Sequence, residues 1–210
     1  MGLDYCTSSL TSGYSNILLK APYTADGTQI CLNGSNYGLT VAKNGTGLAM
    51  NPQYYRGTGS SYINSNDGGY ANSYANKVLS GQVLQLFPSY WRGYLFNAYW
   101  VTNTAPTTTT IVGVGNQIAL PAEYEIYGVN TCGNLIESDH LVQYPAYANG
   151  LTPIHGKLGN VRVAAYVWLR TSCRFNSANF CLTGNAGNES THGPASFDYG
   201  VAPVFVIAAI

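Results

Sequence analysis

Residues 161–170, VRVAAYVWLR, form the stretch that decides the fold. Small or branched apolar residues alternate there with larger ones, which is the period of a central strand of a sheet. Further along, residues 180–182 and 201–207 are short apolar runs that predict two more strands. Residues 183–199, between these runs, hold Gly, Asn, Ser, Thr, His and Pro without periodicity. They predict a long surface loop, and such loops are usually functional or disordered.

The segment before this stretch predicts a helix and then a strand. Residues 72–87 place their apolar residues at the spacing of one helical face, with Asn72 or Ser73 as the cap and Pro88 as the stop. Residues 90–101 are rich in Tyr and Trp and predict a core strand. We expect these aromatic side chains to be buried in the core rather than to form a platform for a ligand.

The connecting segments predict little regular structure. Residues 107–110, four threonines, predict an exposed loop or hairpin arm. Residues 117–124 predict a strand followed by a short helical turn with Pro121 at its first position. Residues 128–160 predict mostly irregular chain. The chain as a whole therefore predicts an α+β, β-rich fold with one or two short helices and long loops.

The first sixty residues differ in pattern from the rest. Short apolar runs alternate there with turn residues, and two Asn-Gly pairs, at residues 33–34 and 44–45, favour tight hairpins. We expect residues 1–60 to form a small β-hairpin extension, which could serve as an anchor. Residues 61–210 would then form the main domain.

The composition limits the classes of partner. Only 9% of the residues are charged and the formal net charge is zero. The sequence therefore predicts no basic surface that would bind nucleic acid or an anionic membrane. The polar surface must come largely from Asn, Ser, Thr, Gly and Tyr, and the chain has 18 Tyr and 24 Gly. Recognition surfaces use these residues, but an extended β-rich protein with neutral faces would show the same composition. Low charge also favours a setting in an assembly.

The sequence shows no membrane or secretion segment. No window approaches 18 consecutive apolar residues, and the beginning of the chain lacks the basic and apolar regions of a signal peptide. We expect synthesis in a bacterial cytoplasm without membrane insertion.

The five cysteines are Cys6, Cys31, Cys132, Cys173 and Cys181. They form no C-x-x-C pair and have no metal-ligand spacing with a histidine. No acidic cluster has the spacing of a calcium site either. We therefore expect no metal and no cofactor. Cys173 and Cys181 could form a disulfide between neighbouring strands, but reduced buried thiols are favoured in an intracellular protein.

Four blocks of sequence carry a family resemblance. They are residues 74–79 with 86–88, 118–128 (IALPAEYEIYG), 166–171 (YVWLRT) and 199–207 (YGVAPVFVI). In this order they resemble an uncharacterised domain family of phage and of Gram-positive and gut bacterial surface proteins, whose members read L-P-S-E-x-E-V-F-G, W-W-L-R-S-P and Y-G-V-R-P-A-F. The resemblance covers about residues 60–208.

The resemblance implies a C-type-lectin-like mixed sheet, similar more remotely to formylglycine-generating enzymes and to retroelement-diversified phage receptor proteins. In those proteins a variable stretch is exposed between the framework strands. This chain departs from the family pattern in three ways. Thr171 replaces the usual Ser, the Pro that follows is absent, and Ala202 stands where Arg is commonest. An Arg-dependent tie of the last strand to the core is therefore not expected.

The sequence offers few groups for catalysis. The candidate acid or base groups are Glu123, Glu125, Glu137, Asp139 and His140. Nothing in their spacing fixes a productive pair, so we expect cap or turn roles. Formylglycine-generating relatives use a cysteine pair, but this sequence shows no other feature of that active site. Arg170 follows a buried-looking strand and is expected to hold a loop carbonyl or a carboxylate, and Trp168 is expected in the core.

Recognition requires only a rigid sheet that displays a polar and aromatic patch. The candidate ligand-binding residues are Arg174, Phe175, Asn176, Asn179, Asn185, Asn188, Glu189, His192, Phe197 and Asp198. A solvated loop without a partner is the alternative.

The function that we predict is adhesion by a phage virion protein of a fibre, tail or capsid decoration, through a host-surface glycan or protein. The other partners would be virion proteins, in a homo-oligomer that we expect to be a trimer. Capsid cementing without a ligand and a bacterial surface binding module are the alternatives.

Overall fold

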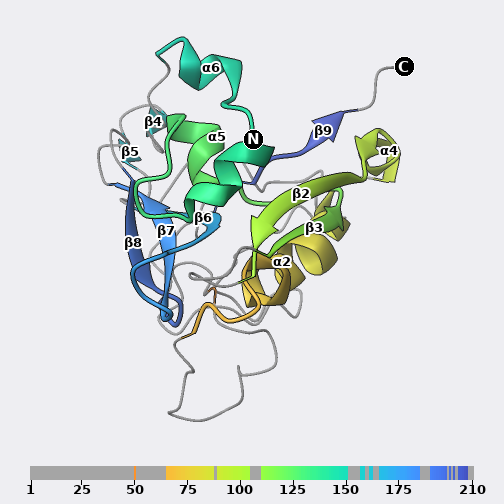
Figure 1. Ribbon diagram of the computed structural model, residues 1–210. Coiled ribbons are helices and arrows are strands. Elements are labelled where there is room, and N and C mark those ends of the chain that lie inside the picture. Colours follow the sequence, from red (N-terminus) through yellow and green to blue (C-terminus); the bar gives the residue numbers. More distant parts are fainter. Residues whose placement is uncertain are drawn as a thin grey trace.

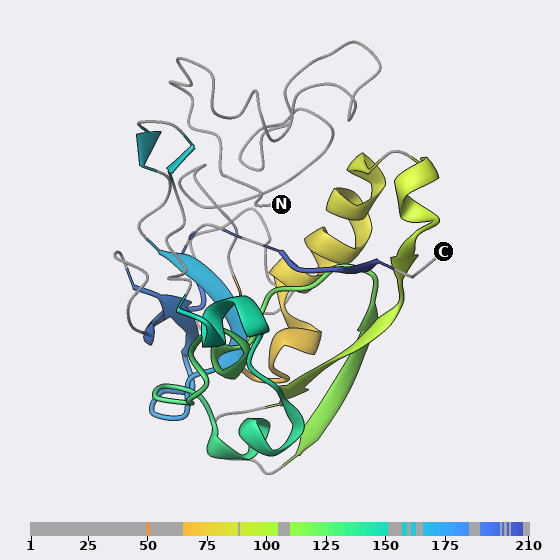
Figure 2. The ribbon, with the colours of Figure 1, turned by 90° about the horizontal axis from the view of Figure 1, so that it is seen from above.

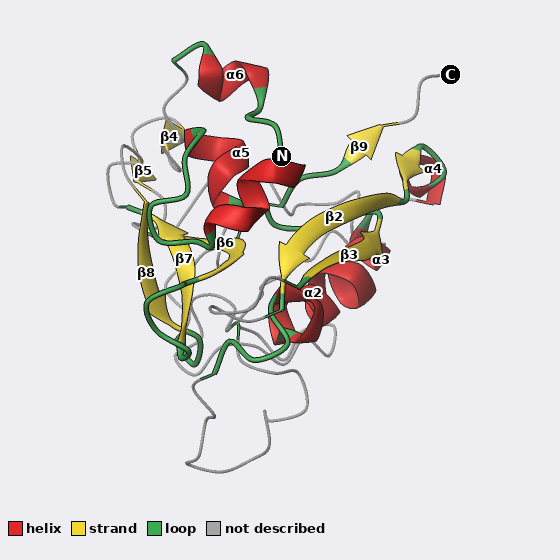
Figure 3. Ribbon diagram, in the orientation of Figure 1, coloured by secondary structure: helices red, strands yellow, loops and turns green. Residues whose placement is uncertain are grey.

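Short helices and antiparallel strands make up the described part of the chain (Figure 3). The structure is a computed structural model, which describes Met50 and residues 65–87, 89–104, 110–150, 157–158, 161–162, 166–184, 190–197, 199, 201 and 203–207. The predicted α+β, β-rich class is confirmed at this level, whereas the lectin-like arrangement stays a prediction. The predicted hairpins of residues 1–60 lie outside the described residues, apart from Met50, which is fully buried in the main core.

The helix predicted over residues 72–87 is confirmed. It consists of α2 (Tyr74–Val78), a π turn η3 (Leu79–Val83) and α3 (Leu84–Leu86), and the short 3₁₀ turn η2 (Tyr70–Asn72) precedes it. Ser73 is the cap, because its hydroxyl oxygen accepts the Asn76 N–H at 3.0 Å. Val78 and Leu79 face the core.

The core strand predicted over residues 90–101 is only partly right. The elements there are α4 (Ser89–Arg92), β1 (Leu95–Phe96), β2 (Ala98–Asn103) and β3 (Ile111–Asn116). Trp100 is buried and donates its indole N–H to the Asn116 carbonyl at 2.7 Å. The expectation that the aromatic side chains of residues 90–101 are buried is wrong for four of them, which are more than half exposed: Tyr90, Trp91, Phe96 and Tyr99. The β2–β3 hairpin buries one face against the helix, so alternate side chains point outward.

Three short helical elements follow the hairpin. They are α5 (Glu123–Tyr127), the 3₁₀ helix η4 (Leu135–His140) and α6 (Pro145–Ala148). The sequence predicted Pro121 at the first position of α5. That prediction is wrong, because the capping residue of this helix is Ala122 and Pro121 lies before it. The strand predicted before it is a single bridge from Ala119 to Val204. Residues 107–109 of the predicted threonine loop lie outside the described residues.

The C-terminal part contains a three-stranded sheet and three strands of two residues each. The strands are β4 (Lys157–Leu158), β5 (Val161–Arg162), β6 (Val167–Ser172), β7 (Asn179–Thr183), β8 (Ser190–Pro194) and β9 (Val206–Ile207). The sheet order is β6-β7-β8, with β4 pairing β5 and β9 pairing β1. The strand predicted at the centre is therefore an outer strand, and β7 takes the centre.

The prediction of a surface loop over residues 183–199 is wrong for residues 190–194, which form β8. This strand pairs antiparallel with β7 along its whole length, from Asn179 opposite Pro194 to Thr183 opposite Ser190. Residues 185–189, the middle of the predicted loop, lie outside the described residues. Pairing with a neighbour, rather than an apolar pattern of its own, makes residues 190–194 a strand.

Two apolar clusters hold these elements together. The larger one joins the helix, the hairpin and β6 through side chains such as Leu79, Trp100 and Trp168. The smaller one gathers Ile126 and Leu169 with three cysteines. Seen from above in Figure 2, the blue strands β6 to β8 lie on one side and the yellow-green β2–β3 hairpin on the other. Figure 1 shows the same arrangement with α5 close to β6.

Candidate functional site

The turn between β6 and β7 carries three of the predicted recognition residues. Phe175 is 66% exposed, and the guanidinium of Arg174 lies over its ring, 4.6 Å from the centroid. Such a contact holds a cation against an aromatic face. The side-chain oxygen of Asn176 accepts the Ala178 N–H at 2.8 Å, which closes the turn.

Phe197 lies at the same end of the sheet. Because β6 and β8 both run antiparallel to β7, the turn after β6 and the residues after β8 meet at one end. The Ala195 N–H donates to the Ala178 carbonyl at 2.8 Å, and Phe197 is about half exposed. We call Arg174, Phe175, Asn176 and Phe197 the sheet-end surface.

The buried side chain of Asn66 fixes the backbone of this turn. Its Nδ2 donates to the carbonyls of Asn176 at 3.1 Å and Asn179 at 2.7 Å, and the Asn66 N–H donates to the Ser177 carbonyl at 2.8 Å. A turn whose carbonyls are held from below loses little conformational freedom on binding a partner. Sequence reasoning missed Asn66, because a single Asn in an irregular segment carries no recognisable pattern.

The other predicted residues are placed differently. Asn179 is buried, and its amide group bonds the Nδ1 atom of His192 at 2.7 Å, so it belongs to the framework rather than to a contact surface. His192 is exposed on β8. Four further predicted residues lie outside the described residues: Asn185, Asn188, Glu189 and Asp198. The structure thus brings four of the ten to one end of the sheet.

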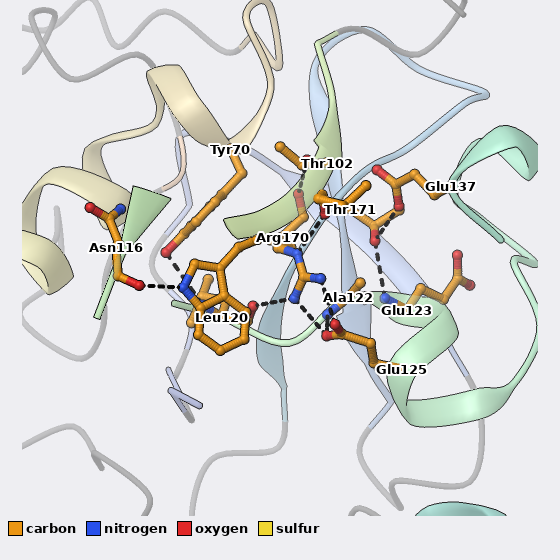
Figure 4. A network of polar contacts seen from close by, with 12 residues as sticks. Tyr70, Thr102, Asn116, Leu120, Ala122, Glu123, Glu125, Glu137, Arg170 and Thr171 are labelled. Atoms are coloured by element: carbon orange, nitrogen blue, oxygen red, sulfur yellow. Dashed lines mark hydrogen bonds and ion pairs between the residues drawn. The ribbon is translucent and has the colours of Figure 1, made fainter. Parts of the chain in front are cut away.

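Arg170 is the centre of a buried polar network (Figure 4). It forms a bidentate ion pair with Glu125, with both N–O distances 2.6 Å. Its Nε donates to the Val101 carbonyl and its Nη1 to the Leu120 carbonyl, each at 2.8 Å. The predicted role of Arg170, to hold loop carbonyls or a carboxylate, is confirmed. The arginine joins β2, the segment before α5, and β6.

Glu123 and Glu125 have the predicted cap and turn roles. The Glu125 carboxylate accepts the N–H of the capping residue Ala122 at 2.8 Å. The Glu123 carboxylate accepts three consecutive backbone N–H groups, of Thr131 at 3.0 Å, Cys132 at 2.9 Å and Gly133 at 2.6 Å. Both carboxylates are therefore engaged in holding the local chain.

Glu137 occupies the end of the same network. Its two oxygens accept the Asn103 N–H at 2.9 Å and the Thr171 hydroxyl at 2.8 Å. The Thr171 hydroxyl oxygen in turn accepts the Glu123 N–H at 3.0 Å. Burial raises the pKa of Glu137 to about 7, although these hydrogen bonds and Arg170 oppose the rise. Thr171 supplies the hydroxyl that the network needs.

Three cysteines lie in the smaller apolar cluster with Ile126 and Leu169. Cys132, Cys173 and Cys181 are free and buried. Burial raises the pKa of Cys181 well above its ordinary value, so this thiol stays protonated. Within the described part of the chain, no group of three or more His, Cys, Asp and Glu side chains is arranged to hold a metal ion.

A pocket that the sequence did not predict lies on the outer face of β2. Its volume is about 650 Å³. Its lining includes Tyr99 and Val101 of β2, His140 and Tyr144 around η4 and α6, and Phe205 and Val206 near β9. Arg170 and Glu125 also line it. Residues from distant parts of the sequence meet here, which is why no local motif predicts the pocket.

Comparison with known protein families, characterised proteins and solved structures finds no match to this chain. The resemblance to the phage and bacterial surface family therefore stays a prediction. Among the described residues, no helix has both the length and the apolar character needed to cross a bilayer.

Proposed function

We propose that the protein is a non-enzymatic recognition protein of a phage virion, which presents the sheet-end surface to a host-surface glycan or protein. The observation that carries the proposal is the exposed Phe175 under the Arg174 guanidinium, on a turn whose carbonyls are bonded to Asn66. Aromatic and arginine side chains contribute most of the binding energy at protein interfaces. A turn that is already held in place binds without a large entropy loss.

The buried carboxylates support a non-enzymatic function. Glu123, Glu125 and Glu137 accept hydrogen bonds from backbone N–H groups, and Glu125 is also paired with Arg170. Groups engaged in this way hold the fold, and their hydrogen bonds occupy the oxygens that a general acid or base would use. Cys173 and Cys181 lie in an apolar cluster, where burial raises the pKa of their thiols and makes them poor nucleophiles.

The virion setting rests on the sequence resemblance and on the composition. The low charge suits a protein that is packed into an assembly. The proposed partners are other virion proteins and a second and third copy of this chain.

The test is adsorption to host cells by particles that carry a Phe175→Ala, Phe197→Ala double variant. We expect adsorption to fall about tenfold or more, as for interface residues whose loss removes 1 to 2 kcal/mol. Phe96→Ala, which removes a phenylalanine of similar exposure from β1, is the matched control and should adsorb normally.

Particles of the double variant that assemble and adsorb normally would contradict the proposal. Capsid cementing makes a different prediction, namely that particles lacking the whole chain lose stability while their adsorption is unchanged.

A further inference from the structure

We propose that the pocket beside Tyr99 is a binding site for the ring of a neutral saccharide. The site is built from β2, the segment before and at the start of α6, and the residues in and before β9, and it shares no residue with the sheet-end surface. The inference therefore does not depend on the proposed adhesion through Phe175 and Phe197.

Tyr99 offers a flat aromatic face that is already in position. It is 80% exposed, although it lies in the middle of a paired strand. The residue opposite is Gly115, and the diagonal neighbour is Gly113. A Cβ atom at Gly113 would lie 3.0 Å from Cδ1 of the Tyr99 ring, and one at Gly115 would lie 3.8 Å from Cε1. The ring thus lies across glycine backbone, where no neighbouring side chain covers its outer face.

Among the described residues, the walls beside this ring include exposed apolar side chains. Val206 is about half exposed and Val142 more so, and both line the pocket. β9, which carries Val206, pairs with β1, the strand that directly precedes β2 in the chain. A volume of about 650 Å³ is in the range of small-ligand sites.

The charges at the base of the pocket compensate one another. Arg170 and Glu125 form a bidentate pair, and two further Arg170 N–H groups donate to the Val101 and Leu120 carbonyls. An ionic ligand would have to break this pair, so the pocket favours a neutral one. Burial, with the Glu125 carboxylate close by and hydrogen-bonded to the Tyr144 hydroxyl, raises the pKa of Tyr144, so this hydroxyl remains protonated, and its oxygen can still accept a hydrogen bond from a ligand hydroxyl.

A pyranose ring fits this combination better than a hydrocarbon or an ionic metabolite. One of its faces consists of C–H groups, whose slightly positive hydrogens are attracted to the negative face of an aromatic ring. Its edge carries hydroxyl groups that can both donate and accept hydrogen bonds. Tyr99 would hold the apolar face, and Tyr144 and the exposed His140 would contact the hydroxyl edge.

The experiment measures binding of neutral methyl glycosides, namely those of glucose, galactose, rhamnose and N-acetylglucosamine, to the full chain by saturation-transfer-difference NMR. We expect at least one of them to bind and Tyr99→Ala to weaken that binding about tenfold. Tyr99→Phe, which keeps the ring, should retain it. Tyr90→Ala removes an exposed tyrosine outside the pocket and should leave it unchanged.

Three outcomes would overturn the proposal. The first is that none of the neutral glycosides binds, and the second is that glucuronate binds more tightly than glucose. The third is that Tyr99→Ala binds the glycoside as tightly as the natural protein does. None of these outcomes bears on adhesion through the sheet-end surface, which the Phe175 and Phe197 variants test separately.

Discussion

The two outer strands of the same sheet, β6 and β8, differ in almost every physical property. All six residues of β6 are buried. The edge of β6 that faces away from β7 is also hydrogen-bonded. The Arg170 N–H donates to the Pro121 carbonyl at 2.9 Å, and the Thr102 hydroxyl donates to the Arg170 carbonyl at 3.3 Å. In β8 only Gly193 is buried. Among the described residues, no further strand pairs with the outer side of β8.

This difference separates the framework from the surface. β6 is held on both sides, so a change in it should affect the whole fold. β8 is held mainly by β7, so its exposed side chains can change with little effect on stability. A protein that varies its surface while keeping its fold needs this division. The comparison predicts that substitutions in β6 and its polar network strongly lower the free energy of unfolding, whereas most substitutions in β8 change it little.

The largest effect is expected for Arg170→Met. The substitution removes the guanidinium and leaves the Glu125 carboxylate buried without its ion-pair partner. Breaking a buried pair in this way costs about 3–5 kcal/mol. Urea unfolding followed by tryptophan fluorescence should show a midpoint reduced accordingly.

Arg174→Met is the matched control for this experiment. Arg174 lies at the exposed turn after β6, where its Nη2 donates to the Thr131 carbonyl at 3.3 Å. Its loss should change the free energy of unfolding by about 0.5 kcal/mol or less. Equal losses in the two variants would contradict the view that β6 is held by its network.

The sequence predicted the elements that bury a periodic apolar pattern. The helix that Ser73 caps and the strand that contains Phe180 were predicted correctly, because hydrophobic spacing and a capping hydroxyl are local signals. The role of Arg170 was also predictable, since a charge that follows a buried strand needs a partner. The aromatic run that ends in Trp100 was misjudged, because composition does not reveal which face of a hairpin is covered.

The candidate sites were much less predictable. β8 has no apolar pattern, and only its register with β7 makes it a strand, so residues 190–194 were taken as loop. Phe175 and Phe197 were correctly chosen as exposed, but Asn66, which fixes the turn, lies over a hundred positions away from it. The pocket beside Tyr99 depends on segments that only the fold brings together.

The second prediction concerns the pH dependence of the network around β6. Burial raises the pKa of Glu137 from the ordinary value of 4.5 to about 7, so the folded protein binds a proton that the unfolded chain releases. The free energy of unfolding should therefore fall as the pH rises from 4.5 to 7, by about 3 kcal/mol at most.

Glu137→Gln should remove this contribution. The glutamine amide resembles the protonated acid, and its oxygen can still accept the Asn103 N–H. Urea unfolding at several pH values should show a flatter profile for the variant between pH 4.5 and 7. A profile parallel to that of the natural protein would mean that Glu137 is not the group responsible.

The smallest effect concerns the one buried position of β8. A Cβ atom at Gly193 would lie 2.7 Å from a Leu182 methyl carbon and 2.7 Å from a Tyr199 ring carbon, so Gly193→Ala must displace a packed side chain and should cost about 1–2 kcal/mol. Gly115→Ala, in strand β3, is the matched control, because its Cβ would find only an ordinary contact at 3.8 Å and should be neutral or slightly stabilising. Thermal unfolding of the two variants measures the difference. If Gly193→Ala were as stable as Gly115→Ala, the side chains of Leu182 and Tyr199 would not be tightly packed against β8 at this position, and the tightly packed framework would end at β7 rather than within β8.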